Sequence, residues 1–288
     1  MEMLVFGGTR SSGIAWSVAK ALKSEVGKSE VKTFPDGEKY VKLLSKAEGR
    51  ECAVVQSVRS NDDFMELLLM LDALRDMGAV QVHAIMPYMA YMRQDKRFTE
   101  GEALSAKTLL KVLDEFADSL TMINCHFLSE GGESFYKHVR FMNLDAVPLL
   151  VKYFRSKVKN PIVVAPDKGS MGYAKAAAEI LDCDFNHLSK KRISGSEVVI
   201  KSKDLDVKGK DVIILDDIIS TGGTIVESVK VIRGWKPASI NVGCVHGLFL
   251  KGIESFTGVV DRLVSTDTLD NPVAKVNVAD LIAEDLKR

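Results

Sequence analysis

The sequence predicts an α/β protein built from two similar halves, each a mainly parallel sheet flanked by helices. Short apolar runs of strand length alternate with helical patterns along the chain, which is typical of parallel sheets covered on both faces. The alternation restarts near residue 143. We therefore expect an N-terminal domain over 1–142 and a C-terminal domain over 143–278, with a terminal helix at 279–288 assigned to the N-terminal domain.

The predicted strands are apolar runs, and they lie at 4–6, 52–58, 80–88, 119–125, 161–165, 211–215 and 239–246. The clearest helix spans 61–78, where apolar residues recur at helical spacing. Asn61 or Asp62 can cap its start and Gly78 can close its end. The run GGTRSSG at 7–13 lacks the GxGxxG spacing of dinucleotide-binding loops, so we interpret it as a strand–helix connection.

Composition excludes several classes of partner. The 288 residues contain 39 Lys plus Arg and 39 Asp plus Glu, so no global field attracts nucleic acid or an anionic membrane. The chain starts with a strand pattern rather than a signal peptide, and no apolar run reaches about 18 residues. The four cysteines fit no zinc or CxxC spacing, which favours reduced thiols. We expect a cytoplasmic protein.

One stretch, DVIILDDIISTGGTIVES at 211–228, combines features of an anion site. Asp216 and Asp217 follow an apolar strand pattern, and strands of a parallel sheet bring ligands to their carboxyl ends. The loop behind them precedes a helix and consists of Ser220, Thr221, Gly222, Gly223 and Thr224. Glycines allow close approach, hydroxyls add donors, and the helix dipole favours an anion.

The two acids restrict the ligand further. Carboxylates beside a phosphate loop repel phosphate unless they bind another part of the same ligand, such as sugar hydroxyls or Mg²⁺. A sugar phosphate meets both demands, with its phosphate on the loop and its hydroxyls on Asp216 and Asp217. A plain strand–helix turn would explain the glycine pair, but not the acids and three hydroxyls.

This stretch resembles the phosphoribosyl-diphosphate-binding motif that type I phosphoribosyltransferases share with ribose-phosphate pyrophosphokinases. Two other segments, FPDGE at 34–38 and RQDKRF at 93–98, resemble the ATP-binding elements of the pyrophosphokinases. The resemblance runs across nearly the whole chain and implies two phosphoribosyltransferase-type domains in a short archaeal-type member. It also implies an ATP-binding set of side chains, namely Phe34, Asp36, Glu38, Arg93, Gln94, Asp95 and His126.

Further roles follow from the same resemblance. PIVVAPDKGS at 161–170 is similar to a Pro-Asp-x-Gly segment that borders the ribose, which implies that Asp167 binds ribose 5-phosphate. His126 and Asp167 are implied to place the metal, with Mg²⁺ as the cofactor. HLSKKRIS at 187–194 reads alone as a solvated charged segment, but the family has a catalytic loop here that maps onto Lys190 and Arg192.

The implied reaction moves the diphosphoryl group of Mg-ATP to the C1 hydroxyl of ribose 5-phosphate and releases AMP. The resemblance further implies a homodimer or larger homo-oligomer, with the 34–38 segment completing the ATP site of a neighbouring subunit. Two alternatives stay open. A type I phosphoribosyltransferase would share the 211–228 motif but not the N-terminal elements, and a non-catalytic nucleotide-binding regulatory relative would be expected to lack the cationic segment or the acids.

Overall fold

The computed structural model describes residues 3–126, 128, 131–136, 139–192, 198–201 and 206–288. It forms two compact units. Unit 1 comprises Met1–Asp145 with Asn277–Arg288, and unit 2 comprises Ala146–Val276. The division lies three residues beyond the sequence-based boundary at 142.

In the described part of unit 1, seven strands form one sheet in the order β2-β1-β5-β6-β7-β9-β8, parallel except for the β8–β9 pair. Its strands are β1 (Leu4–Gly7), β2 (Glu25–Val26), β5 (Glu51–Val55), β6 (Gln81–Met86), β7 (Ser119–Ile123), β8 (Gly132–Tyr136) and β9 (Val139–Leu144). Its helices are α1 (Ser12–Leu22), α2 (Asn61–Asp76), α3 (Ser105–Phe116) and α7 (Ala279–Leu286).

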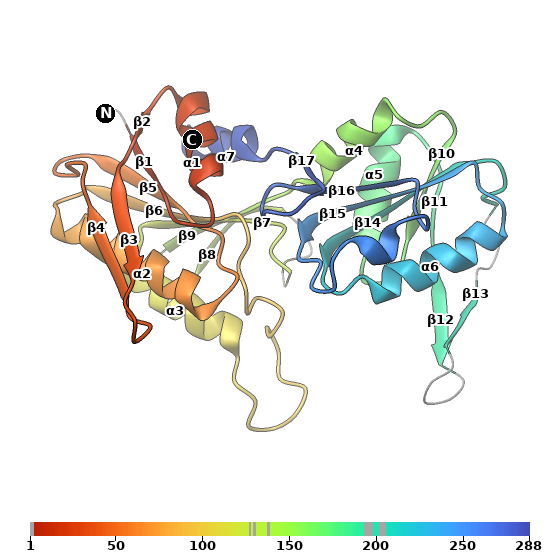
Figure 1. Cartoon of the computed structure of the whole chain (residues 1–288), viewed down its shortest axis with the longest axis horizontal. Coiled ribbons are helices and arrows are strands. Elements are labelled where there is room, and N and C mark those ends of the chain that lie inside the picture. Colours follow the sequence, from red (N-terminus) through yellow and green to blue (C-terminus); the bar gives the residue numbers. More distant parts are fainter. Residues whose placement is uncertain (1–2, 127, 129–130, 137–138, 193–197, 202–205) are drawn as a thin grey trace. The chain divides into compact units, whose positions relative to one another are not determined.

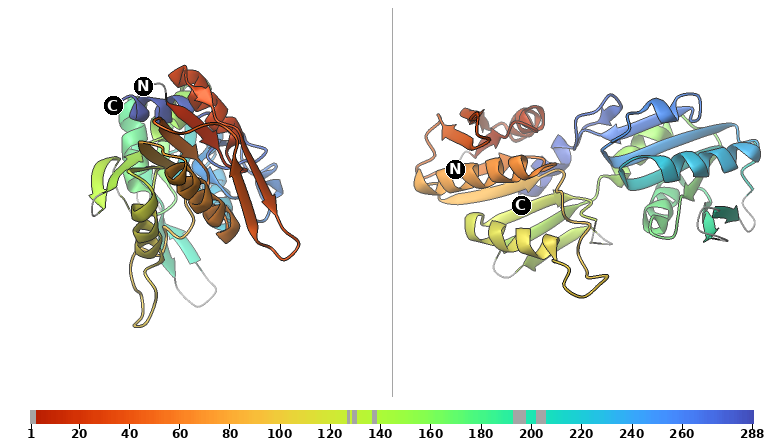
Figure 2. Two further views of the ribbon diagram at one scale, coloured as in Figure 1. Left: turned by 90° about the vertical axis from the view of Figure 1, so that its left-hand side faces the viewer. Right: turned by 60° about the horizontal axis from the view of Figure 1, so that its bottom comes forward.

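Helices cover both faces of this sheet, α1 and α7 on one and α2 and α3 on the other (Figure 1). Leu4 and Phe6 alternate with Val5 along β1, so successive side chains are buried on opposite faces. A separate antiparallel hairpin, β3 (Ser29–Thr33) and β4 (Lys39–Leu43), projects beyond the sheet (Figures 1 and 2).

In the described part of unit 2, six parallel strands form a sheet in the order β11-β10-β14-β15-β16-β17. Its strands are β10 (Pro161–Ala165), β11 (Phe185–His187), β14 (Asp211–Ile219), β15 (Ser239–Gly247), β16 (Arg262–Thr266) and β17 (Ala274–Val276). The flanking elements are α4 (Val147–Arg155), α5 (Met171–Leu181), α6 (Gly223–Gly234) and the 3-10 helix η1 (Glu254–Phe256).

Helices α4 and α5 cover one face of that sheet and α6 covers the other (Figure 1). An antiparallel ribbon, β12 (Ser189–Arg192) with β13 (Val198–Lys201), lies apart from it. Among the described residues of the chain, no helix has the length and apolar character that a membrane span requires.

Two local predictions are wrong. The strand expected at 211–215 continues to Ile219, because β15 is equally long and pairs with it as far as Gly247. Helix α2 is capped by Ser60 rather than Asn61 or Asp62. The Ser60 hydroxyl accepts a bond from Asp63 N and the Asp63 carboxylate accepts one from Ser60 N, a reciprocal capping box.

Candidate functional site

The two acids of the 211–228 stretch lie inside β14 near its carboxyl end. Asp217 is buried and Asp216 is partly exposed. Asp216 Oδ1 accepts bonds from Ser170 Oγ at 2.9 Å and from Asp217 N at 3.0 Å. Asp217 Oδ1 accepts one from Ile218 N at 2.9 Å. The pair is thus fixed by local backbone groups and by one side chain from the neighbouring strand–helix connection.

That side chain, Ser170, also ties in the third predicted acid. Asp167 Oδ1 accepts bonds from Gly169 N at 2.9 Å, Ser170 N at 3.2 Å and Ser170 Oγ at 3.4 Å. Ser170 therefore joins Asp167, after β10, to Asp216, in β14. Ser170 is not among the predicted site residues, although it follows Gly169 directly in the segment that carries Asp167.

The surroundings of Asp216 disfavour the ionised form of its side chain. Burial, and then the charges of Asp217 and Asp167, raise the pKa of Asp216 to about 7. Its carboxylate lies in a site that favours neutralisation by a proton, hydroxyl donors or a cation. Within the described residues, no group of three or more His, Cys, Asp or Glu side chains could hold a metal ion. Any cation at this edge would therefore need oxygens from a ligand as well.

The predicted phosphate loop lies directly beyond these acids. Gly222 caps α6 in the left-handed conformation, with φ of 80°. A Cβ on it would lie 2.5 Å from the buried Phe256 ring, so only glycine fits. Among the described residues, the backbone N–H groups of 221–225 find no protein acceptor, nor do the hydroxyls of Ser220, Thr221 and Thr224 make a hydrogen bond. Gly223 and Thr224 belong to the first helical turn. The loop can donate to an anion.

The cationic segment forms one strand of the β12–β13 ribbon. Lys190 pairs with Ile200 and Arg192 with Val198 in the antiparallel register. The structure describes the backbone of these positions. The residues that follow Arg192, 193–197, lie outside the described residues.

The predicted ATP-binding residues belong to unit 1. Phe34, Asp36 and Glu38 occupy the tip of the β3–β4 hairpin, where Phe34 N donates to Glu38 O at 2.8 Å. Phe34 is 46% exposed, although its ring packs edge-to-face with that of Tyr40 at 5.9 Å between centroids. An exposed aromatic ring next to two exposed acids is available to a ligand or to another chain.

Arg93, Gln94 and Asp95 lie in the long loop between β6 and α3, and His126 follows β7. Arg93, Asp95 and His126 are exposed, whereas Gln94 is half-buried. Both segments follow parallel strands at the carboxyl edge of the unit 1 sheet. The two residues predicted to place the metal, His126 and Asp167, belong to different units.

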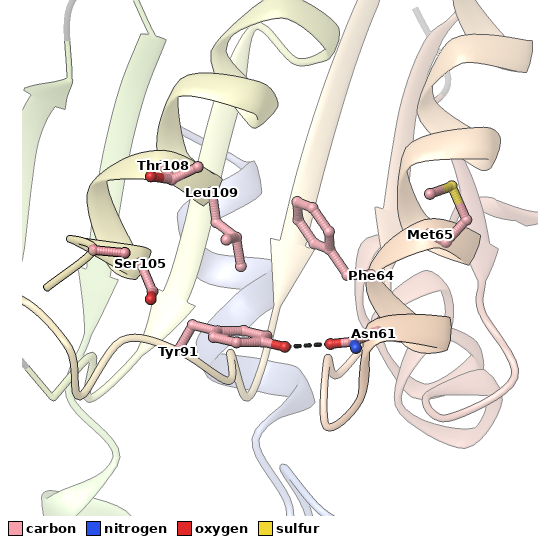
Figure 3. Close-up of a pocket in the computed structure, with 8 residues that line it drawn as sticks. Asn61, Phe64, Met65, Tyr91, Ser105, Thr108 and Leu109 are labelled. Atoms are coloured by element: carbon pink, nitrogen blue, oxygen red, sulfur yellow. Dashed lines mark hydrogen bonds between the residues drawn. The ribbon is translucent and has the colours of Figure 1, made fainter.

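A cavity of about 350 Å³ lies beside this loop, between the N-terminal ends of α2 and α3 (Figure 3). Tyr91 lines one side and its hydroxyl donates to Asn61 Oδ1. The other lining residues are mainly apolar and comprise Phe64, Met65, Ala103, Ser105, Thr108 and Leu109. None was selected from the sequence.

Comparison with known proteins identifies the family. The model for the N-terminal domain of ribose phosphate pyrophosphokinase matches residues 3–116, and the phosphoribosyl transferase domain model matches 144–256. The ribose-phosphate pyrophosphokinase of Methanothermobacter thermautotrophicus is 39% identical over 289 residues, covering 99% of this chain and 100% of that protein. This chain belongs to the ribose-phosphate pyrophosphokinase family.

Other members of the family agree with that assignment. The ribose-phosphate pyrophosphokinase of Pyrococcus furiosus is 40% identical over 259 residues, covering 89% of this chain and 91% of that protein. A crystal structure of phosphoribosylpyrophosphate synthetase from Mycobacterium smegmatis matches with a TM-score of 0.85 at 25% identity, covering 100% of this chain and 98% of that one. The predicted family and the fold of two phosphoribosyltransferase-type domains are confirmed.

Proposed function

We propose that this chain transfers the diphosphoryl group of Mg-ATP to the C1 hydroxyl of ribose 5-phosphate, giving 5-phosphoribosyl 1-diphosphate and AMP. The observation that carries the proposal is the Asp216–Asp217 pair beside the open loop at 220–224, in a chain that also has the pyrophosphokinase N-terminal domain. A phosphoribosyltransferase needs the pair and the loop but not that N-terminal domain.

The acceptor sugar would bind in unit 2. The unpaired N–H groups of 221–225 and the nearby hydroxyls suit the 5-phosphate. Asp216 and Asp217 suit the ribose hydroxyls, because a carboxylate is a strong acceptor for O–H donors. In the reaction, the C1 oxygen attacks the β-phosphorus of ATP and loses its proton. The bond from that phosphorus to the bridging α,β-oxygen breaks, so AMP leaves with the bridging oxygen.

The donor set at Asp167 and Asp216 fits Mg²⁺, a hard cation that takes carboxylate and phosphate oxygens. We propose that Asp167 and His126 help to hold it, and that bound Mg²⁺ neutralises charge on the triphosphate. One oxygen of Asp167 is occupied by Gly169 and Ser170 donors, and Oδ2 accepts no bond from the described part of the chain. The Oδ2 atom of Asp167 can therefore bind a cation.

Lys190 and Arg192 are proposed to stabilise the charge that develops during transfer. A contact made mainly in the transition state lowers turnover when removed, with little effect on ground-state binding. We expect Lys190→Ala to reduce kcat by about 10²-fold or more, with Michaelis constants near those of the wild type. Steady-state kinetics test this, and near-normal turnover would remove Lys190 from the catalytic set.

One product assay tests the proposed reaction. Purified protein incubated with ATP, Mg²⁺ and ribose 5-phosphate should form AMP and phosphoribosyl diphosphate in equal amounts. Formation of ADP would indicate γ-phosphoryl transfer and would overturn the proposal. Absence of any product would favour the non-catalytic relative. Since all four cysteines are free thiols, we place the reaction in the reducing cytoplasm.

We further propose a homodimer or larger homo-oligomer in which Phe34, Asp36 and Glu38 complete the ATP site of a neighbouring subunit. The exposed hairpin tip supports this. An Asp36→Ala, Glu38→Ala double variant and Lys190→Ala should each be nearly inactive alone. Refolded together in equal amounts, they should regain up to about a quarter of wild-type activity, because one site of each mixed dimer carries no lesion. Mixed dimers without recovered activity would show that each site is built from one chain.

A further inference from the structure

Several residues of the loop between β6 and α3 donate hydrogen bonds to one carboxylate, that of Glu102, which is not among the predicted site residues. Glu102 Oε2 accepts bonds from Phe98 N at 2.6 Å and from Thr99 N at 3.2 Å. Glu102 Oε1 accepts one from Thr99 Oγ1 at 2.9 Å. These bonds, led by that from Phe98 N, hold the pKa of Glu102 below its ordinary value. The charged Glu102 side chain therefore holds Phe98 and Thr99 in the C-terminal part of the loop. We call these hydrogen bonds the Glu102 clasp.

Glu102 also contacts Arg97 and Gln94, which lie earlier in the same loop. The Glu102 carbonyl accepts a bond from Arg97 Nε at 2.8 Å. Glu102 Oε2 accepts another from Gln94 Nε2 at 3.4 Å, and Gln94 Nε2 donates to Lys96 O at 3.2 Å as well. A single residue thus contacts both ends of the segment that resembles an ATP-binding element.

Backbone bonds lock the position of Gln94 itself. Its N–H donates to Tyr91 O at 3.1 Å and its carbonyl accepts a bond from Ala106 N at 3.3 Å. Both partners of Gln94 Nε2 can only accept, so the amide must turn its nitrogen inward. Among the described residues nothing donates to Gln94 Oε1. Gln94 is left with an acceptor for a ligand donor such as a hydroxyl or an amino group.

We propose that Glu102 is a positioning residue for nucleotide binding: it holds Gln94, and through the same short loop the backbone that carries Arg93, in place before the ligand arrives. The inference rests on the proposed function, since it takes Arg93 and Gln94 as nucleotide contacts. Ordering a long exposed loop costs conformational entropy, and a loop ordered beforehand loses less of it on binding.

The test compares Glu102→Gln with Glu100→Gln. Both remove one negative charge from the same loop, but Glu100 is exposed and makes no hydrogen bond in the described part of the chain. In Glu102→Gln the new amide nitrogen faces N–H donors and at least one clasp bond is lost. We expect the KM for ATP to rise by about fivefold or more, with the KM for ribose 5-phosphate and kcat within about twofold of wild type. Glu100→Gln should match the wild type.

Limited trypsin digestion gives a readout independent of catalysis. Lys96 and Arg97 lie within the clasped segment, so cleavage after them should be faster in Glu102→Gln than in Glu100→Gln at equal thermal stability. Equal cleavage rates and an unchanged KM for ATP would overturn the positioning role. A rise in both Michaelis constants alike would also overturn it, because that would indicate a general structural defect.

The two proposals fail in different ways. If the wild type makes no AMP from ATP and ribose 5-phosphate, the proposed function fails whatever the digestion shows. If it makes AMP but the two variants behave alike in both measurements, the function stands and the role of Glu102 fails.

Discussion

A strand, a short loop and a helix follow one another at β1–α1 in unit 1 and at β14–α6 in unit 2. Both loops contain adjacent glycines, hydroxyl residues and a helix start. By sequence alone, either could accept an anion. The structure separates them by the partners of their polar groups.

In the unit 1 loop, the polar groups of Thr9 and Arg10 donate hydrogen bonds to side chains of the protein itself. Thr9 N and Thr9 Oγ1 donate to the two oxygens of Glu66 at 2.6 and 2.8 Å. Arg10 N donates to Gln56 Oε1 at 3.1 Å, and the Arg10 guanidinium bonds Asp63. Glu66 is fully buried, so the loop is anchored to α2 by a buried acceptor.

The unit 2 loop has no equivalent acceptor in the described part of the chain. Of the two acids that precede it, Asp216 accepts bonds from Ser170 Oγ and Asp217 N, and Asp217 accepts one from Ile218 N. Glycine content alone therefore does not distinguish the two loops. The difference lies in the backbone donors at 221–225, which lack a protein acceptor among the described residues; because Thr221, Gly223 and Thr224 are exposed, a ligand can reach these donors.

The largest expected effect comes from closing the unit 2 loop with a methyl group. In Gly222→Ala the Cβ would lie 2.5 Å from the Phe256 ring, and alanine is strained at a φ of 80°. The loop must move, so we expect kcat/KM for ribose 5-phosphate to fall by about 10²-fold or more. Steady-state kinetics measure this.

Gly13→Ala in unit 1 is the matched control. Nothing lies within 4 Å of a Cβ at Gly13, which belongs to the first turn of α1. We expect activity within about twofold of wild type, because alanine is favoured over glycine in a helix. Equal losses in the two variants would show that the open loop has no special role.

Much of the fold could be predicted because burial leaves a pattern. The predicted strands at 4–6 and 161–165 match β1 and β10, whose apolar residues pack against helices. The hairpin strands β3 and β4 were not predicted, because most residues of SEVKT and KYVKL are only half-buried and do not alternate between buried and exposed positions. Edge and ribbon strands are set by pairing rather than by an apolar run.

The site was predictable where chemistry is local in sequence. Asp216, Asp217 and the loop at 220–224 are adjacent along the chain, so their combination was visible. Ser170 joins the acids from 46 residues away, and Glu102 resembles any exposed acid in a polar loop. Contacts of this kind depend on the tertiary structure, so a short sequence motif does not predict them.

The next largest effect is expected from replacing an acid near each loop, Asp217 in unit 2 and Asp63 in unit 1. Asp217→Asn replaces a carboxylate by a poorer acceptor for sugar hydroxyls, so we expect the KM for ribose 5-phosphate to rise by about tenfold. Asp63→Asn in unit 1 removes the partner of Arg10 and part of the α2 capping box. It should lower stability by about 1–2 kcal/mol and leave that KM unchanged. A similar rise in KM for both variants, seen in parallel kinetics and thermal unfolding, would contradict the assignment.

A smaller effect should appear in the pH dependence of binding. Because the pKa of Asp216 is raised to about 7, the folded protein holds a proton that the unfolded chain releases from about pH 4 upward. The stability this group contributes is therefore fully present below pH 4 and is lost as pH rises through 7. Sugar hydroxyls donate to the ionised form, so affinity for ribose 5-phosphate should increase by a few-fold across the same range.

Asp216→Asn separates this effect from ionisation of the substrate phosphate. The variant keeps the size of the side chain but cannot titrate. Its KM for ribose 5-phosphate, measured from about pH 6 to 8, should change less with pH than that of the wild type. Parallel pH profiles for the two proteins would show that Asp216 does not titrate in the binding range.

The smallest effect is expected in the unit 1 loop. Glu66 accepts both donors of Thr9, and Glu66→Gln keeps its shape but offers one acceptor oxygen instead of two. The Thr9 hydroxyl can rotate to accept from the new amide, so we expect a loss of only about 1 kcal/mol in the free energy of unfolding. Urea denaturation should detect it as a lower midpoint with an unchanged slope. The Michaelis constants for ATP and ribose 5-phosphate should stay within about twofold of wild type, because the donors of this loop serve α2 rather than a ligand. If Glu66→Gln instead keeps full stability and loses activity, the unit 1 loop binds a ligand and the contrast between the two loops is wrong.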